Sequence, residues 1–481
     1  MTGRVTFANR RCSNACPVKP EYHSGVSAAV KLAAEHQVSA RFHSMSDATV
    51  AIRSRSNSLA SSFSGWWTKV RTSLPWMVLI ALGLRLGTVV FMHTYKFRTN
   101  DLNFSFGWEM GRIGAAIATG RGFADPFEGH TGLTAWEPPL YPYLIAGVFK
   151  IFGVYSLASA FVMLALSSIF SALTCIPIFL IAKRCFGEKV AVASAWTWAL
   201  LPYVMFWSTK VVWETSLSAL FLAILFLLTL TMEEKDNWKP WALYGLLWGA
   251  AALNSTSLLS FLPASGLWIW YRRSKRGKRS FGGIVLAAVL FLACNAPWVV
   301  RNHNVFGKFI FSRDNFGAEL SYGNVDWAEG TCLCFLHPTQ NVYAMHQYVQ
   351  LGELGYVNLR KERSMAFIKA RPGRFLWLSV KRFIFFWDGA PKLTKIWWLA
   401  ETKNSLFLAS SVLMLWGLGR ALRKRIPNAW LFFWLTLLYP AIYYFVYALP
   451  RYRHPIEPIL LILGIYLICE AEIKGRPIGS I

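Results

Sequence analysis

The chain has 481 residues, of which 55% are hydrophobic, 16% aromatic and only 15% charged. A soluble protein carries about 25% charged residues, so this composition excludes an ordinary soluble domain. The net charge of +26 does not indicate nucleic-acid binding, because the Lys and Arg residues cluster in short loops between apolar runs, as in the cytoplasmic loops of membrane proteins.

The first 65 residues are polar, rich in Ser, Arg and Ala, and poor in acids. We expect a disordered basic cytoplasmic tail over residues 1–70 and a membrane domain over 71–475. The tail has no apolar core of its own, so it does not resemble a secretory signal. Translation can start at Met1 or at Met45.

Apolar runs near 20 residues match a hydrocarbon layer of about 30 Å. They predict an all-α polytopic membrane protein with about ten transmembrane helices. The expected crossings are 74–93, 157–182, 189–208, 214–232, 240–256, 257–271, 281–300, 404–420, 428–449 and 455–471.

Basic residues fill the loops at 183–184, 272–279 and 420–425 and precede the first crossing. This bias places both termini in the cytoplasm, and we expect a multi-pass protein of the cell (inner) membrane. The apolar stretches 138–153 and 375–387 are predicted as helices in the outer interface, because counting either as a crossing would move a basic loop outside.

Two large segments, 94–156 and 301–403, then lie outside. The first carries five of the chain's 24 acids in a short space: Asp101, Glu109, Asp125, Glu128 and Glu137. Carboxylates beside a bilayer are costly unless they do chemistry or bind a cation, so we expect the active site here.

A short helix is predicted over Phe106–Thr119, with Glu109 in its first turn and on the same face as Arg112. It is either one half of a surface ion pair or a general base. Glu137 is fixed between Trp136 and two prolines. It is either an acid at a helix start or a ligand of a metal or phosphate site.

These motifs resemble the GT-C superfamily of membrane glycosyltransferases, which use polyprenyl-phosphate sugars. The closest branch is that of the protein O-mannosyltransferases and aminoarabinose transferases. The resemblance covers about residues 74–471. It rests on Glu109 at a helix start, Gly120-x-Gly122-Phe123, Pro138-Pro139-Leu140-Tyr141-Pro142, Pro297-Trp298 with Arg301-Asn302 and Phe306-Gly307, and Arg451-Tyr452-Arg453 with Pro455 and Pro458.

The resemblance implies that Glu109 is the catalytic base, with Asp101 as the alternative. It places Glu137 near a divalent metal cation, the one cofactor that we expect. Aminoarabinose transferases often have a Lys between this Glu and the prolines. Here Glu137 runs directly into Pro138, so that lipid-phosphate contact is missing.

Transfer of a sugar frees a lipid phosphate whose charge needs cations. Arg451, Arg453 and Arg301 lie at the ends of predicted crossings and are our candidates for binding the donor phosphate, with membrane anchoring as the alternative for each. The implied partners are a polyprenyl-phosphate sugar, membrane lipid, and a glycan, lipid or protein acceptor. Nucleic acid is not among them.

The competing hypotheses are a glycolipid transporter or flippase and a non-catalytic membrane scaffold. A transporter needs acids within its crossings, which are nearly free of them. Three further residue groups stay open. Glu214 either caps a helix or lines the cavity. His303 and His337 either complete a cation site or form ordinary hydrogen bonds. Cys332 and Cys334, too close for an easy disulfide, are expected to be structural.

Overall fold

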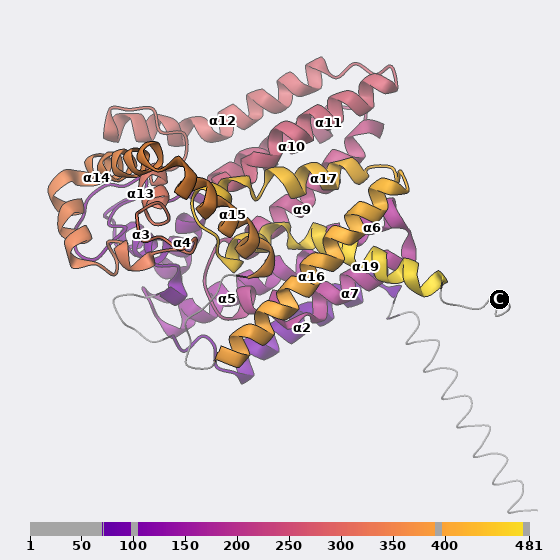
Figure 1. The fold of residues 1–481 in the computed structure, drawn as a ribbon, viewed down its shortest axis with the longest axis horizontal. Helices are drawn as coiled ribbons and strands as arrows, with labels where there is room; N and C mark the ends of the chain where they lie inside the picture. Colours follow the sequence, from indigo (N-terminus) through magenta and orange to yellow (C-terminus); the bar gives the residue numbers. More distant parts are fainter. Residues whose placement is uncertain (1–69, 71, 98–103, 390–396, 475–481) are drawn as a thin grey trace, which may run out of the picture. The chain divides into compact units, whose positions relative to one another are not determined.

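The computed structural model describes residues 70, 72–97, 104–389 and 397–474, which lie in the compact unit that begins at Val70 (Figure 1). The described residues form helices and loops without a strand, apart from one isolated bridge between Ala124 and Leu133. The expected all-α fold is confirmed. The predicted tail, except for Val70, and Asp101 lie outside the described residues.

Most helices follow one another with short connections, whereas longer segments join α3 to α4 and α13 to α14. In chain order they are α2 (Leu74–Phe91), η1 (Phe104–Phe106), α3 (Glu109–Ala118), α4 (Leu140–Phe152), α5 (Leu157–Leu173), α6 (Cys175–Phe186), α7 (Glu188–Leu200), α8 (Pro202–Thr209), α9 (Thr215–Thr231), η2 (Met232–Glu234), α10 (Lys239–Asn254), η3 (Thr256–Phe261), α11 (Leu262–Lys275), α12 (Phe281–Phe306), α13 (Phe316–Ser321), η4 (Cys334–Leu336), α14 (Val342–Ala370), α15 (Pro372–Asp388), α16 (Trp397–Arg423), α17 (Ala429–Leu438), α18 (Ala441–Phe445), η5 (Pro450–Ile456) and α19 (Glu457–Lys474).

Within the described residues, six helical segments are long and apolar enough to cross a membrane, or seven if the bent pair α7 and α8 is one crossing. The six are Leu74–Phe91, Leu157–Phe186, Thr215–Glu234, Phe281–Phe306, Asn404–Arg423 and Pro450–Glu470. We expected ten. The other predicted crossings fall on helices that are shorter than a bilayer needs, among them α10, α11 and α17.

Helix α9 lies at the centre of the bundle. It is apolar around its whole circumference, which is typical of a helix that is buried on all sides. It packs against α5, α6, α10, α11 and η5. A helix of its 17 residues is about 25 Å long, so α9 separates the two ends of the bundle by that distance.

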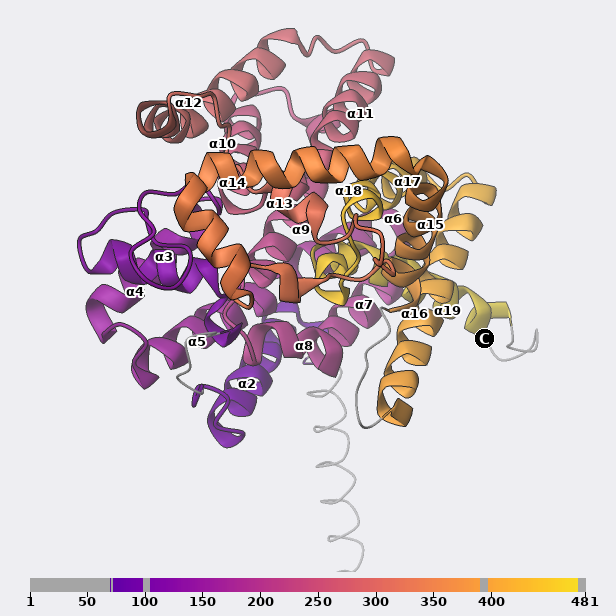
Figure 2. The same ribbon diagram turned by 60° about the vertical axis from the view of Figure 1, so that its left-hand side comes forward.

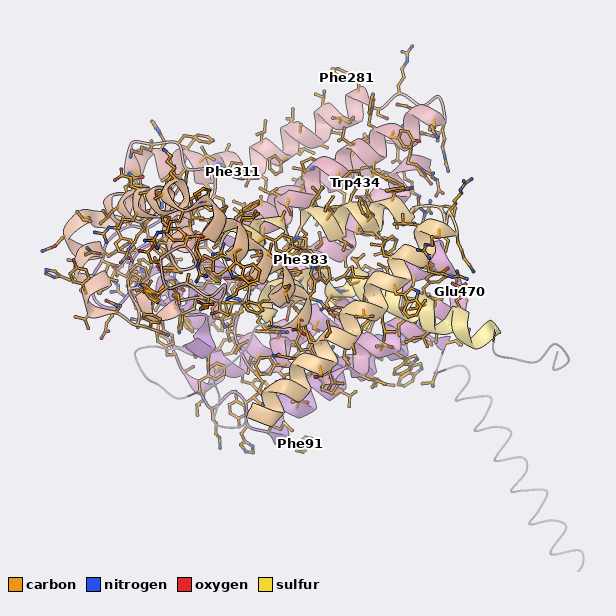
Figure 3. The ribbon with its side chains drawn as sticks, in the orientation of Figure 1. Phe91, Phe281, Phe311, Phe383, Trp434 and Glu470 are labelled. Carbon is orange, nitrogen blue, oxygen red and sulfur yellow. A yellow bond between two sulfur atoms is a disulfide. The ribbon has the colours of Figure 1, made fainter. Side chains whose placement is uncertain are left out.

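One end of α9 is basic. Glu233, which is buried just after α9, pairs with Arg272 at 2.5 Å, with Arg276 at 3.2 Å and with Arg184 at 3.4 Å. Two of the three loops predicted to be cytoplasmic, 183–184 and 272–279, therefore meet around one acid. A second acid, Glu470 (labelled in Figure 3), pairs in the same way with Arg420 of α16 and with Lys424, which follows α16.

The other end of the bundle carries the helices of the two predicted outer segments. Helix α3 packs against α4, and α13 packs against α14, which lies over it in Figure 2. Helix α12 runs from the basic end to this one. In Figure 3, Phe281 marks its first residue and Phe311 the segment after its end.

The two predicted interfacial stretches are also helices, α4 and α15. Arg382 of α15 is fully buried rather than reaching a membrane surface. Its guanidinium donates to backbone carbonyls of Gly323, Tyr444 and Phe445. It therefore ties α15 to two other segments of this end.

At the break between α7 and α8, a buried arginine donates hydrogen bonds to free backbone carbonyls. The chain bends by 51° at this break, because Pro202 cannot continue α7. Arg85 of α2 is fully buried and donates at 3.0 Å to each of the carbonyls of Trp198 and Ala199, which the break leaves unpaired.

We predict that Arg85→Ala destabilises the protein. It leaves two buried carbonyls without donors, each costing about 1–3 kcal/mol. Thermal unfolding in detergent measures the loss. Arg121→Ala, which removes a half-exposed arginine, is the control and should change the melting temperature little. Equal melting temperatures for the two variants would contradict the role of Arg85.

Candidate functional site

The segment before α3 is folded tightly against the start of α9. Gly107 has a φ of 74°, and a Cβ there would lie 2.7 Å from the carbonyl oxygen of Val212, so only glycine fits. The backbone N–H of Val212 donates to Ser105 at 2.7 Å. This turn places Glu109 in the first turn of α3 with only 5% of its surface exposed.

Glu109 meets His337 from the second outer segment. The Nε2 of His337 lies 2.9 Å from Oε1 of Glu109, while its Nδ1 accepts the backbone N–H of Thr339 at 3.2 Å. Because Nδ1 accepts, Nε2 carries the proton and donates it to Glu109. The predicted pair with Arg112 is replaced by this contact.

The His337 ring is held on several sides by other aromatic rings. It stacks on Trp108 at 5.5 Å and meets Phe127 edge-on at 5.4 Å. Tyr322 and Trp136 complete the enclosure at 5.3 and 6.1 Å. These rings fix the imidazole, and through it they fix the orientation of the Glu109 carboxylate.

Glu137 is buried in the same region. Its Oε2 lies 3.6 Å from the Nη1 of Arg313, the residue that sequence analysis left unassigned. Burial raises the pKa of Glu137 well above its ordinary value of 4.5, and Arg313 partly offsets this. Nearby carboxylates raise it further; they belong to Glu109, Glu214 and Glu319.

Arg451 approaches this group of acids from η5. Its guanidinium carbon lies 3.6 Å from the centroid of the Trp213 ring, a close cation–π contact. Glu214, the next residue, attracts it electrostatically. Glu214 occupies the position before α9 but makes no capping hydrogen bond, so its carboxylate is directed to the site rather than to the helix.

Hydrogen bonds connect Tyr452, the residue after Arg451, to Glu319 of α13. The hydroxyl of Tyr452 donates to that of Tyr447 at 3.0 Å, and Tyr447 donates to Oε2 of Glu319. The segment Val212–Glu214 therefore contacts the Ser105–Gly107 turn that precedes Glu109 and, through Trp213, the guanidinium of Arg451. The acids and Arg451 come from four distant parts of the chain and meet at one end of α9.

The other two predicted phosphate ligands have different surroundings. Arg453 is fully buried and donates to Glu457 at 2.7 Å and to both Ser410 and Ser411. Arg301 donates to the carbonyls of Thr134 at 2.6 Å and of Phe123 at 2.9 Å. Both guanidiniums are thus occupied by contacts that hold the fold.

Among the described residues, no three His, Cys, Asp or Glu side chains lie close enough together to hold a metal ion. Glu137 faces Arg313, and His337 is bonded to Glu109, so the cation contact implied for Glu137 does not fit these residues. We derive no step through a metal. Cys332 and Cys334 form a disulfide, contrary to our expectation, in the segment that leads to His337.

Sequence analysis missed the partners of its two central acids. His337 appeared either as part of a cation site or as a residue with ordinary hydrogen bonds, and Arg313 was given no role. Neither lies at helical spacing from the acid it contacts, so no periodic pattern connects them. Their one signal is the presence of basic side chains in the second large segment on the same predicted membrane face.

Comparison with known proteins finds one matching family model and several similar solved structures. The family described as dolichyl-phosphate-mannose-protein mannosyltransferase matches residues 136–300. The oligosaccharyltransferase AglB from Archaeoglobus fulgidus, solved with an inhibitory peptide and a dolichol-phosphate, superposes with a TM-score of 0.51 at 16% identity, over 86% of this chain and 51% of that one.

The apo form of the same archaeal enzyme gives a TM-score of 0.50 at 16% identity, over 83% of this chain and 51% of that chain. ArnT from Cupriavidus metallidurans, bound to undecaprenyl phosphate, gives 0.36 at 11% identity over 85% and 79%. The chain spans about half the length of the archaeal structures. No curated protein matches it by sequence.

The expected resemblance to the GT-C membrane glycosyltransferases is therefore confirmed. The fold is that of the archaeal enzyme's corresponding half, and the mannosyltransferase family matches the stretch from Trp136 through most of α12. Glu137 lies at the start of that stretch.

We predict that the stability of the protein falls with rising pH because of Glu137. A carboxyl whose folded pKa is raised favours the protonated folded state, so stability is highest at low pH and declines as pH rises above about 4.5. Glu137→Gln should reduce this decline, measured as thermal unfolding in detergent between about pH 5 and pH 8.

The control for this experiment is Asp326→Asn, which changes an exposed carboxylate in the same half of the chain. Its pH dependence should match the wild type. A Glu137→Gln curve parallel to the wild-type curve would contradict the assigned environment of Glu137.

Proposed function

We propose that this protein is an integral-membrane glycosyltransferase that transfers a monosaccharide from a polyprenyl-phosphate-linked donor to a protein, lipid or polysaccharide acceptor. The observation that carries the proposal is that the Val212–Glu214 segment contacts both the turn before Glu109 and the guanidinium of Arg451. A base and a phosphate-binding cation are the two groups that such a transfer needs.

Glu109 acts on the acceptor. The acceptor hydroxyl attacks the anomeric carbon, its proton passes to the Glu109 carboxylate, and the bond from that carbon to the donor phosphate breaks. This single displacement inverts the anomeric centre. His337 is a positioning residue, since its Nε2–H bond to Oε1 leaves Oε2 as the oxygen that receives the proton.

Arg451 binds the lipid phosphate that leaves. Its guanidinium lies over the Trp213 ring, and its N–H groups can make forked contacts to phosphate oxygens. Arg313 is the second cation of the site and is oriented by Glu137. Of our three sequence candidates, Arg451 thus retains the donor-binding role. Arg453 and Arg301 support the fold around it.

The two ends of α9 support a membrane orientation. The basic loops around Glu233 lie at one end, and the acids lie about 25 Å away at the other. The positive-inside rule places the basic end and both termini in the cytoplasm. The site then faces the outer side of the membrane.

We predict that Glu109→Gln lowers sugar transfer by about 100-fold or more while the protein still folds and inserts, because the amide cannot accept the acceptor's proton. The assay uses purified protein in detergent with radiolabelled polyprenyl-phosphate sugars and membrane acceptors. Glu128→Gln alters an exposed acid of the same loop and should retain full transfer.

Unchanged transfer by Glu109→Gln would reject Glu109 as the base. If the wild type transfers no sugar from polyprenyl phosphates but moves a glycolipid between the leaflets of vesicles, the flippase hypothesis replaces ours.

We predict different outcomes for two arginines only two residues apart. Arg451→Gln should weaken undecaprenyl phosphate binding about tenfold or more with little change in melting temperature. Arg453→Gln leaves Glu457 buried without its cation and should cost about 3–5 kcal/mol of stability. Titration with undecaprenyl phosphate and thermal unfolding measure the two effects. A loss of stability in Arg451→Gln together with weaker lipid-phosphate binding by a stable Arg453→Gln would contradict the site.

A further inference from the structure

Glu353 is a buried carboxylate with no role in the proposed transfer. It follows Gly352, whose φ of 67° and ψ of 172° break α14 into two helices. Only 6% of its surface is exposed. The break turns Glu353 inward, so its carboxylate reaches a segment that comes from the first outer loop.

Three donors converge on this carboxylate. The backbone N–H of Ala135 donates to Oε1 at 2.7 Å. The hydroxyl of Tyr348 donates to Oε2 at 2.9 Å, and the hydroxyl of Thr134 donates to the same oxygen. A carboxylate that accepts three hydrogen bonds is a strong, directional anchor.

The segment that Glu353 holds is Thr134–Trp136, which directly precedes Glu137. The backbone N–H of Thr134 donates to Phe123 at 3.1 Å, its carbonyl accepts Arg301 at 2.6 Å, and its hydroxyl accepts the N–H of Trp136 at 2.9 Å. The acceptor for the backbone N–H of Ala135 thus comes from Glu353 of α14 and not from the first predicted outer segment.

The same segment is aligned with Arg313. The backbone N–H of Asp314 donates to the carbonyl of Ala135 at 2.9 Å. Ala135 therefore has Glu353 on its N–H side and Asp314 on its C=O side. Glu137 lies two residues after Ala135. Its partner Arg313 lies one residue before Asp314.

We propose that Glu353 is a positioning residue that sets the register between the Thr134–Glu137 segment and Arg313. By this contact it places the second phosphate-binding cation of the site. The consequence for donor binding rests on the proposed function, whereas the positioning itself does not.

The ionised form of Glu353 makes the anchor. Burial raises its pKa to about 7, against the effect of its three donors, and Asp314 raises it further. The charged or titratable groups that face it are Asp314, Tyr348 and, across the segment, Arg301. Protonation places a hydrogen on an oxygen that now accepts one, so the anchor should weaken as pH falls below about 7.

Hydrogen exchange followed by mass spectrometry of the full-length protein in detergent tests the positioning. Glu353→Ala should speed the exchange of the Ala135 and Trp136 amides about tenfold, and Glu353→Gln, which keeps one acceptor oxygen, should speed it less. Glu362→Gln, an exposed acid on the same helix, should leave the exchange unchanged.

A pH series separates positioning from a general loss of structure. After correction for intrinsic rates, protection of the Ala135 amide should fall in the wild type between about pH 8 and pH 6 and stay level in Glu353→Gln. Equal protection in the wild type and Glu353→Ala overturns the proposal. If Glu353→Ala does not fold, an identical pH series for the wild type and Glu353→Gln overturns it.

Titration with undecaprenyl phosphate tests the link to the donor. Glu353→Gln should bind it about tenfold more weakly than the wild type. Equal binding, with the exchange altered as expected, overturns the link to Arg313. If the wild type itself does not bind, the proposed function fails, and the exchange data still decide the role of Glu353.

Discussion

The hydrogen bond from His337 to Glu109 is the contact on which the candidate site depends. It joins the first outer loop to the second, two segments that share no helix. A carboxylate buried in an apolar surrounding needs a donor, and an imidazole walled by aromatic rings needs an acceptor, so each residue supplies what the other lacks. The aromatic rings around His337 hold this pair in place.

The arginines described above fall into two groups. Arg85, Arg382 and Arg453 are fully enclosed, and their N–H groups donate to carbonyls, hydroxyls or a carboxylate of neighbouring helices. They replace backbone hydrogen bonds at breaks and connect helices. Arg313 and Arg451 instead face acids or an aromatic ring at one end of the bundle. Arg313 and Arg451 are also more exposed than the first three, and in the proposed function their N–H groups are the ones available to an anionic ligand.

The 3-10 geometry of η5 explains how neighbouring residues enter different groups. With three residues per turn, positions two apart point in directions about 120° from each other. Arg451 therefore lies on Trp213 near the start of α9, while Arg453 turns toward α16 and Glu457. From sequence alone both are arginines at the mouth of a helix. Only their directions distinguish Arg451, which we propose as a phosphate ligand, from Arg453, which connects helices inside the fold.

The sequence by itself determined the membrane class, the helical fold, the short helix with Glu109 in its first turn and the apolar helices α4 and α15, because apolar runs, prolines and helix starts are local signals. It predicted about ten crossings, whereas six or seven helical segments among the described residues are long and apolar enough to cross a bilayer. The tertiary structure decided which distant residues meet: Glu109 with His337, Glu137 with Arg313, and Glu353 with Thr134 and Ala135. Such pairs depend on how whole helices pack and where α14 bends, and no spacing along the chain encodes that.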